Sequence, residues 1–179
     1  MRKFIFLCII CNQIFAISAS EIVADFSAGE YKKVCSNAVE SYFKKSDDEE
    51  IMSLYGMACL KLHEINRLAA PMFKLVRNKQ SRENAAYFAD ILLKKKLLYH
   101  AVIDDVDISY IRLPRSDYIL SFIFDKFVKK EYINDSGTYI FKEANSDTHY
   151  ELSVKDGEIK RLVLRIFKDE EIKTEIEYW

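Results

Sequence analysis

The sequence predicts an α+β protein, with antiparallel helical hairpins followed by a helix and a β-meander of three or four antiparallel strands. Between residues 27 and 110 an apolar pattern recurs every 34 residues, so that Tyr31, Ile65 and Tyr99 are equivalent. Such a period with helical internal spacing indicates stacked helical hairpins. Beyond Tyr132 apolar and polar residues alternate, as in strands with one buried face. Only 4 Gly and 2 Pro occur, which favours long regular elements.

The first 20 residues resemble a secretory signal peptide. They combine a short basic start, an apolar run over residues 4–10 and small residues before the expected cleavage site. We expect cleavage after Ser20, or alternatively after Ser18. Asn12 and Gln13 interrupt the apolar run, so an uncleaved membrane anchor is the less favoured interpretation.

Cleavage would change both the charge and the cysteine count. It would leave 25 basic and 28 acidic residues, a net charge near −3 that gives no attraction to nucleic acid or anionic lipid. Cys8 and Cys11 would be removed with the signal. We therefore expect a soluble protein in the bacterial periplasm, an equivalent compartment or the medium, without a membrane span after cleavage and without a nucleic-acid partner.

Residues 21–112 are predicted to form the helical domain. Ser27-Ala-Gly-Glu30 reads as a capping box that opens a helix to about Lys45, and a second box begins at Ser46. Further helices are expected at about 51–62, 64–78, 81–96 and from Leu97 to about 104. Pro71 is expected to bend or break the third helix because it removes a hydrogen bond.

Residues 54–68 resemble a tetratricopeptide repeat. Gly56 and Ala58 match its small positions, residues 62–65 match its turn, and Leu68 and Met72 match core positions. The resemblance covers residues 27–110, about two and a half repeats, and Sel1-like repeats are an alternative label. It implies a concave surface that grips peptides or partner proteins. By this resemblance, such a surface would include Lys61, Asn84 and Asp90.

The two cysteines beyond the signal suggest a disulfide. Cys35 and Cys59 lie symmetrically about the predicted turn at residues 46–48, so antiparallel helices would place them at the same height. In an oxidising compartment we expect them to be bonded, which would stabilise the fold by roughly 3 kcal/mol. The alternative is two small buried core cysteines.

Residues 113–179 are predicted to form a small α+β domain. A helix is expected at 117–130, with a strand at 118–124 as the alternative because that run is aromatic and β-branched. Strands are expected at about 138–143, 150–154, 158–168 and 172–178, with Asp156-Gly157 as the strongest hairpin signal. The helix is expected to cover one face of the sheet. Aromatic residues are dense in this part: Phe122, Phe124, Phe127, Tyr139, Phe141 and Tyr150.

The sequence offers no catalytic, cofactor-binding or metal-binding motif. His63, His100 and His149 lack metal-ligand spacing, and the carboxylates at 104–107 lack the glycine and distal glutamate of a calcium loop. Lys94-Lys95-Lys96 is interpreted as a helix terminus that suits the negative end of the dipole. No glycine-rich phosphate loop or nucleophile elbow is present. We therefore expect a protein without enzymatic activity.

Three functional hypotheses follow. The leading one is an exported adaptor or scaffold that binds a protein or peptide partner in the cell envelope. The alternative is a small-ligand or lipid-binding module that uses a cleft between the 117–130 helix and the sheet. In the third, the signal is retained as an anchor and the helical part assists the assembly of a membrane-held complex.

Overall fold

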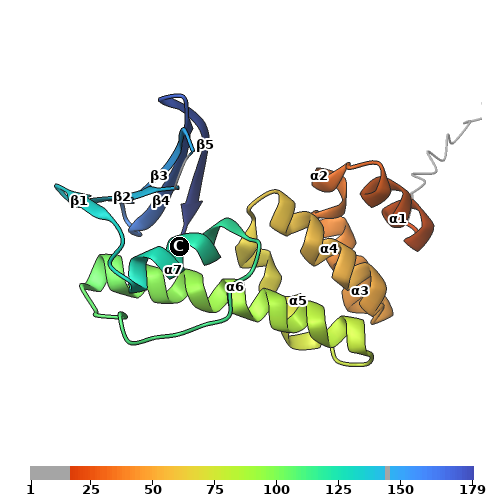
Figure 1. Cartoon of the computed structure of the whole chain (residues 1–179). Helices are drawn as coiled ribbons and strands as arrows, with labels where there is room; N and C mark the ends of the chain where they lie inside the picture. Colours follow the sequence, from red (N-terminus) through yellow and green to blue (C-terminus); the bar gives the residue numbers. More distant parts are fainter. Residues whose placement is uncertain (1–16, 144–145) are drawn as a thin grey trace, which may run out of the picture.

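The computed structural model describes residues 17–143 and 146–179 of the 179-residue chain. Within them, helices precede a five-stranded antiparallel sheet, which confirms the α+β prediction. Residues 1–16 of the predicted signal lie outside the described residues. In Figure 1 the helical part and the sheet lie at opposite ends of the molecule, and the long helix α6 runs beneath both.

The helices are α1 (Ala19–Ser27), α2 (Tyr31–Val34), α3 (Asn37–Ser46), α4 (Glu49–Lys61), the 3-10 helix η1 (Ile65–Leu68), α5 (Ala69–Lys74), α6 (Lys79–Asp104) and α7 (Ile119–Val128). The strands are β1 (Ile133–Asp135), β2 (Thr138–Lys142), β3 (Thr148–Lys155), β4 (Arg161–Lys168) and β5 (Glu171–Tyr178).

The 34-residue period appears in the backbone of two turns. The N–H of Glu30 donates to the carbonyl of Asp25 at 2.9 Å, and one period later Glu64 donates to Cys59 at the same distance. Gly29 and His63 both take a left-handed conformation, with φ of 78° and 60°. Helices α1 and α4 therefore end in the same way, and each is followed by a short helix.

The predicted first helix is wrong in its boundaries. Ser27 is the last residue of α1, not a cap, and its hydroxyl donates to the carbonyl of Val23. The span to Lys45 is divided into α2 and α3, with Ser36 as the N-cap of α3. A short polar side chain that can bond the backbone locally favours such a break. Helix α4 is capped by Asp48, two residues after the expected Ser46.

Helix α6 is continuous over 26 residues, so the expected boundary at Leu97 is absent. The third copy of the repeat keeps its apolar positions but has no turn at Leu97, where the helical hydrogen bonding continues without a break. Lys94 and Lys95 consequently lie in the middle of the helix, where both are buried. Their interpretation as a helix terminus is wrong.

The third predicted helix is divided next to Pro71. The chain is a 3-10 helix up to Leu68 and becomes α-helical at Ala69, within one turn of the proline. This position tolerates proline because the first N–H groups of a helix have no intrahelical partner. Gly56 allows α4 and α6 to approach closely, since a Cβ there would lie 2.5 Å from the ring of Phe88.

The sheet has the order β1-β2-β3-β4-β5, one strand more than expected. Residues 136–137 and 169–170 form tight turns with positive φ, and the sequence predicts turns at both places, at residues 134–137 and 169–170. Asp156-Gly157 does not form the tight hairpin that the sequence signal suggests. Lys155 pairs with Arg161, which leaves a five-residue loop between β3 and β4 and starts β4 three residues later than expected.

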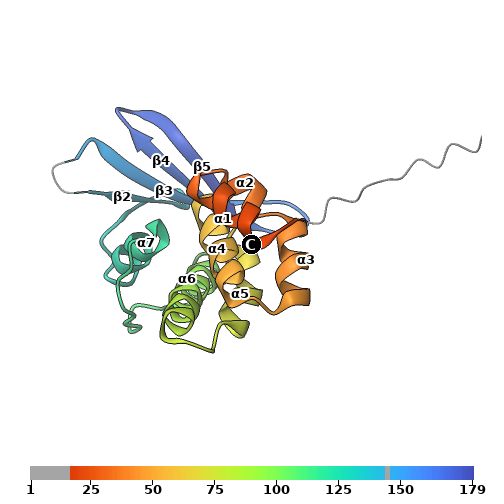
Figure 2. The same ribbon diagram turned by 90° about the vertical axis from the view of Figure 1, so that its right-hand side faces the viewer.

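One hydrophobic core runs through both parts of the chain. Helix α7 lies between the sheet and α6 in both views (Figures 1 and 2). The inner face of the sheet carries buried residues from four strands, including Phe141, Leu152, Leu164 and Ile176. Edge strand β5 lies nearest the helical part and the three-residue β1 farthest from it (Figure 1). A boundary at residues 112–113 would thus divide a shared core.

Candidate interaction groove

A groove of about 560 Å³ separates the turn after α4 from strand β5. One wall consists of residues 62–67 and the other of Glu175, Ile176, Glu177 and Trp179. We call this the α4–β5 groove. Its lining combines apolar side chains with charged ones, which is the composition of a site that recognises both shape and charge.

The first wall is built by the second of the repeated turns. His63 adopts a left-handed conformation that costs most residues with a Cβ about 1–2 kcal/mol. Its Nδ1 shares a hydrogen bond of 3.1 Å with the hydroxyl of Tyr118, which lies 3.3 Å from the hydroxyl of Tyr178. Burial lowers the pKa of His63 and raises the pKa of Tyr118 to about 12. This neutral chain connects the turn to α7 and β5.

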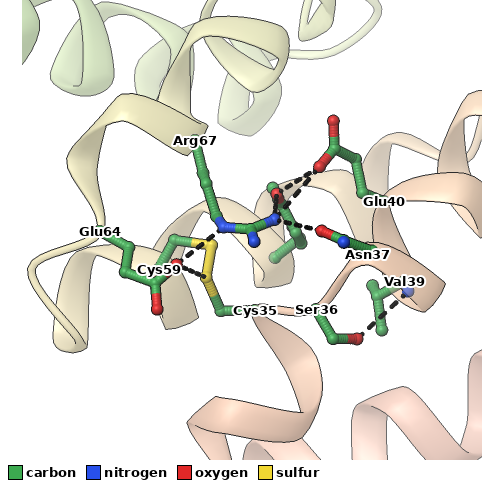
Figure 3. Close-up of a disulfide and its surroundings, with 9 residues drawn as sticks. Cys35, Ser36, Asn37, Val39, Glu40, Cys59, Glu64 and Arg67 are labelled. Carbon is green, nitrogen blue, oxygen red and sulfur yellow. Dashed lines mark hydrogen bonds and ion pairs between the residues drawn. A yellow bond between two sulfur atoms is a disulfide. The ribbon is translucent and has the colours of Figure 1, made fainter.

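Arg67 joins the same wall to the first helices. Its Nε donates to Glu64 at 2.7 Å, and its Nη1 donates to Asn37 at 2.9 Å, to the hydroxyl of Tyr55 at 3.2 Å and to Glu40 at 3.3 Å (Figure 3). The hydrogen bond to Tyr55 is the main cause that raises the pKa of Arg67. The guanidinium thereby holds α3, α4 and η1 in one arrangement.

Cys35 and Cys59 form a disulfide beside this network, as the sequence predicts (Figure 3). The bond joins the end of α2 to the last turn of α4, and both cysteines are buried. Glu64 Oε2 lies 3.8 Å from Cys35 Sγ. A disulfide sulfur has no proton to donate, so this is a contact and not a hydrogen bond. The bond fixes the helix end from which the groove wall begins.

The second wall is the free edge of the sheet. Trp179 is 47% exposed, and the guanidinium carbon of Arg161 lies 5.0 Å from its ring centroid. Glu177 accepts from Lys155 at 2.5 Å and from Arg161 at 2.6 Å, which holds the pKa of its carboxyl below the usual value. Glu175 accepts from Arg165 at 2.7 Å. These exposed ion pairs orient the wall and contribute little to stability.

Lys95 connects the two walls of the groove through hydrogen bonds to both. Its Nζ donates to Asn66 Oδ1 at 2.5 Å and to the main-chain oxygen of Trp179 at 2.6 Å. Burial, with the charge of Lys96 acting in the same direction, lowers the pKa of Lys95 to about 8. The sequence analysis did not identify Lys95 as part of a site. The one indication was that helical periodicity places this lysine on the buried face of the helix.

Lys94 joins α6 to the segment before α7. Its Nζ donates to Asp90 at 2.7 Å, to the carbonyl of Pro114 at 2.5 Å and to the hydroxyl of Ser121 at 2.9 Å. Each buried lysine therefore fixes a different part of the chain on the same helix. A buried ammonium that has several oxygen acceptors specifies position, because no apolar contact is equally directional.

The structure does not bring together the three residues predicted for a partner surface. Lys61 is exposed at the end of α4, next to the groove. Asn84 lies in a separate hollow of about 460 Å³ between α4 and α6. Asp90 is bound internally by Lys94 and by the hydroxyl of Ser116. Of the three, Lys61 is the one adjacent to the α4–β5 groove.

The interface between α7 and the sheet is filled by aromatic rings. Phe122 packs on Tyr150 with centroids 5.1 Å apart, and Phe127 packs on Tyr139 at 5.2 Å. Phe124 and Phe141 are buried. A hollow of about 360 Å³ opens at one end, where the 105–109 loop meets Phe127 and Tyr139. A ligand there would touch the edge of this interface.

The remaining candidate residues are dispersed. His100 bonds Asp104 in the last turns of α6, and His149 stacks on Phe167 on the outer sheet face. No group of three or more potential ligands that could hold a metal occurs within residues 17–143 and 146–179. In the same residues, no helix has both the length and the apolar character needed to cross a membrane.

Comparisons of this chain with protein-family models, with curated proteins and with solved structures find no match.

Proposed function

We propose that this is an exported, non-enzymatic interaction protein that holds a protein partner of the cell envelope in the α4–β5 groove. The observation that carries the proposal is the construction of the groove. Its walls come from the repeat-like turn and from the sheet, and both are fixed by a disulfide, the Arg67 network and Lys95. A preorganised surface of this kind reduces the entropy lost on binding.

Export is the second part of the proposal. The apolar leader-like start and the disulfide both suit an oxidising compartment. Ser18 caps α1 by accepting from the N–H of Glu21 at 3.2 Å, so cleavage after Ser20 would remove this cap. Helix α1 would still be held by Ile22, which is fully buried.

The resemblance to tetratricopeptide repeats belongs to the same proposal. It is supported by the repeated turn geometry at residues 28–30 and 62–64 and by the close approach of α4 and α6 at Gly56. In this proposal the concave surface of the family is replaced by a groove between one hairpin and a sheet, because the third repeat continues as a single helix.

Two measurements test the proposal. Intact mass of the protein from its own envelope, with and without reduction, should show loss of the leader and a gain of about two mass units on reduction. A full-length chain with free thiols would contradict export. For the site, a benzophenone amino acid at Asn66 or Glu175 should give a partner adduct in cells, whereas the same group at exposed Lys142 on the opposite part of the sheet should not. Equal labelling from Lys142 would overturn the assignment of the groove.

The ligand-binding alternative retains one supporting observation, the hollow beside Phe127 and Tyr139. It would take an elongated apolar molecule whose end reaches the aromatic cluster. Quenching of tyrosine fluorescence by a spin-labelled fatty acid would support it, and the absence of quenching would contradict it.

A further inference from the structure

We propose that a second site of this protein binds a small organic cation, a quaternary ammonium of the choline type, in the hollow where α6 and α7 end. We call this the α6–α7 hollow. It has a volume of about 360 Å³ and shares no lining residue with the α4–β5 groove, so the inference goes beyond the proposed function. Small-molecule pockets occupy about 300–1,000 Å³. Three features of the hollow indicate the chemistry of its ligand.

The first feature is a wall of aromatic rings. Phe127 comes from α7, Tyr139 from β2 and Tyr132 from the segment before β1, and all three line the hollow. Their ring centroids lie 5.1–5.2 Å apart in each pair. The rings therefore form one continuous aromatic surface. Such surfaces attract cations, because the face of each ring carries the negative part of its quadrupole.

The second feature is a carboxylate that is not neutralised. Within residues 17–143 and 146–179, Asp105 forms neither an ion pair nor a hydrogen bond through its side chain, which lines the same hollow. Burial is the main cause that raises the pKa of Tyr139, and Tyr132 and the Asp105 carboxylate act in the same direction. The carboxylate is therefore close enough to the rings to act on the same ligand.

Asp107 and Lys130 are the other charged residues of the lining. Asp107 accepts from the N–H and from the hydroxyl of Ser109, both at 3.0 Å. These bonds hold the pKa of its carboxyl below the usual value, and the charge of Lys130 acts in the same direction. Lys130 thus offsets Asp107, and two carboxylates with one ammonium leave a net charge of −1 in the lining.

The third feature is the end of α6. A helix C-terminus carries about half a negative charge, which cations stabilise. Helix α3 ends in Lys44 and Lys45, but α6 has no basic residue in its last turn. It ends at Asp104, which His100 bonds, and Asp105 follows as its C-cap. Negative groups at this end of a helix are unfavourable by themselves, and a bound cation would compensate for them.

The lining favours a quaternary ammonium over other ligands. Calcium would need about six to eight oxygen ligands, and the hollow offers two carboxylates. A primary ammonium would bring three N–H donors, which need oxygen acceptors that rings do not supply. A quaternary ammonium has no N–H, so its methyl groups can lie against the rings while its charge faces Asp105. An uncharged or anionic apolar molecule would gain nothing from this carboxylate.

The test uses the oxidised mature protein and three probes at constant ionic strength. Choline is compared with its neutral carbon isostere, in which a tert-butyl group replaces the trimethylammonium, and with ammonium ion, which has the charge without the methyl groups. Asp105→Asn removes the free carboxylate. Asp169→Asn is the matched control, because Asp169 is also an exposed aspartate with a left-handed backbone, but lies in the turn between β4 and β5. Binding is followed by NMR.

We expect choline to bind with a Kd of about 1 mM, the affinity that a few contacts of this kind allow. Nuclear Overhauser effects should connect its methyl protons to the ring protons of Tyr132 and Tyr139. The neutral isostere and ammonium ion should each bind at least about ten-fold more weakly. Asp105→Asn should weaken the binding of choline about five-fold, whereas Asp169→Asn should leave it unchanged.

Four results would overturn the proposal. Equal binding of the neutral isostere would assign the hollow to an apolar ligand, and equal binding of ammonium ion would show attraction by charge alone. The proposal also fails if choline shows no Overhauser effect to the rings, or if both variants weaken its binding equally. None of these results depends on crosslinking from Asn66 or Glu175, so failure of this site is distinguishable from failure of the proposed function.

Discussion

The turns at residues 28–30 and 62–64 have nearly the same backbone, but only the second is hydrogen-bonded to the sheet half of the molecule. In the first turn Gly29 takes the left-handed conformation, and a Cβ there would meet nothing within 4 Å. In the second, His63 takes it, and its ring bonds Tyr118. The difference shows how a repeated local structure acquires a separate role. The strained left-handed backbone of His63 is retained because its side chain forms a hydrogen bond with Tyr118 in a distant part of the chain.

The largest effect should come from the disulfide, which holds the second turn and has no counterpart at the first. Reduction of Cys35–Cys59, or the double variant Cys35→Ala/Cys59→Ala, should lower the free energy of unfolding by about 3 kcal/mol, because the unfolded chain loses a constraint across 24 residues. Urea unfolding in oxidising and reducing buffers measures this. The reductant should not change the urea midpoint of the double variant. A decrease in the free energy of unfolding of less than about 1 kcal/mol, both in the reduced wild type and in the double variant, would contradict the expectation.

Substitution of His63 should distinguish strain from bonding. His63→Ala keeps the left-handed strain but loses the hydrogen bond to Tyr118, so we expect a loss of about 2 kcal/mol in the free energy of unfolding. His63→Gly also loses the bond but removes the strain, and should be about 1 kcal/mol more stable than the alanine variant. Equal stabilities of these two variants would show that the turn is not strained.

Gly29 provides the corresponding measurement on the first turn. Gly29→Ala should cost about 1 kcal/mol through backbone conformation alone, because no atom lies near enough to clash. Gly157→Ala is the matched control. Its backbone is not left-handed, and a Cβ there would make an ordinary contact of 3.5 Å with a carbonyl, so it should be neutral or slightly stabilising. A neutral Gly29→Ala would refute the similarity of the two turns.

The smallest effect concerns pH. Burial lowers the pKa of His63 below 6.5, so the folded state favours the neutral ring. The unfolded chain then binds more protons than the folded one between the two pKa values, and stability falls as the pH decreases below about 6.5. The first turn has no such group. In urea titrations from pH 7 to pH 5, His63→Gln should lose stability less steeply than the wild type, and parallel curves would contradict this assignment.

The sequence predicted those features that depend on local chemistry. The alternation of apolar residues placed the last three strands, and the symmetry of Cys35 and Cys59 about the turn predicted their bond. Helix boundaries were less predictable. Ser27 and Ser46 have the side chains of caps, yet both end helices, because a serine hydroxyl bonds equally well to a carbonyl four residues earlier.

The groove itself was not predictable from local patterns. Its walls are about 110 residues apart in the chain, and no motif relates them. Lys94-Lys95-Lys96 shows the reason most clearly. Three successive lysines look like a solvated helix end, and only the tertiary contacts of α6 turn two of them inward, Lys94 onto Ser121 of α7 and Lys95 onto the main-chain oxygen of Trp179.

By itself, therefore, the sequence determined the α+β class, the repeated turns and the disulfide, since each follows from the periodicity or spacing of residues close in the chain. The tertiary structure decided that α6 is continuous, that its buried lysines bind both parts of the molecule, and that β5 is left with a free edge beside the second turn. Those outcomes depend on contacts between distant segments, whose free energies local sequence patterns do not encode.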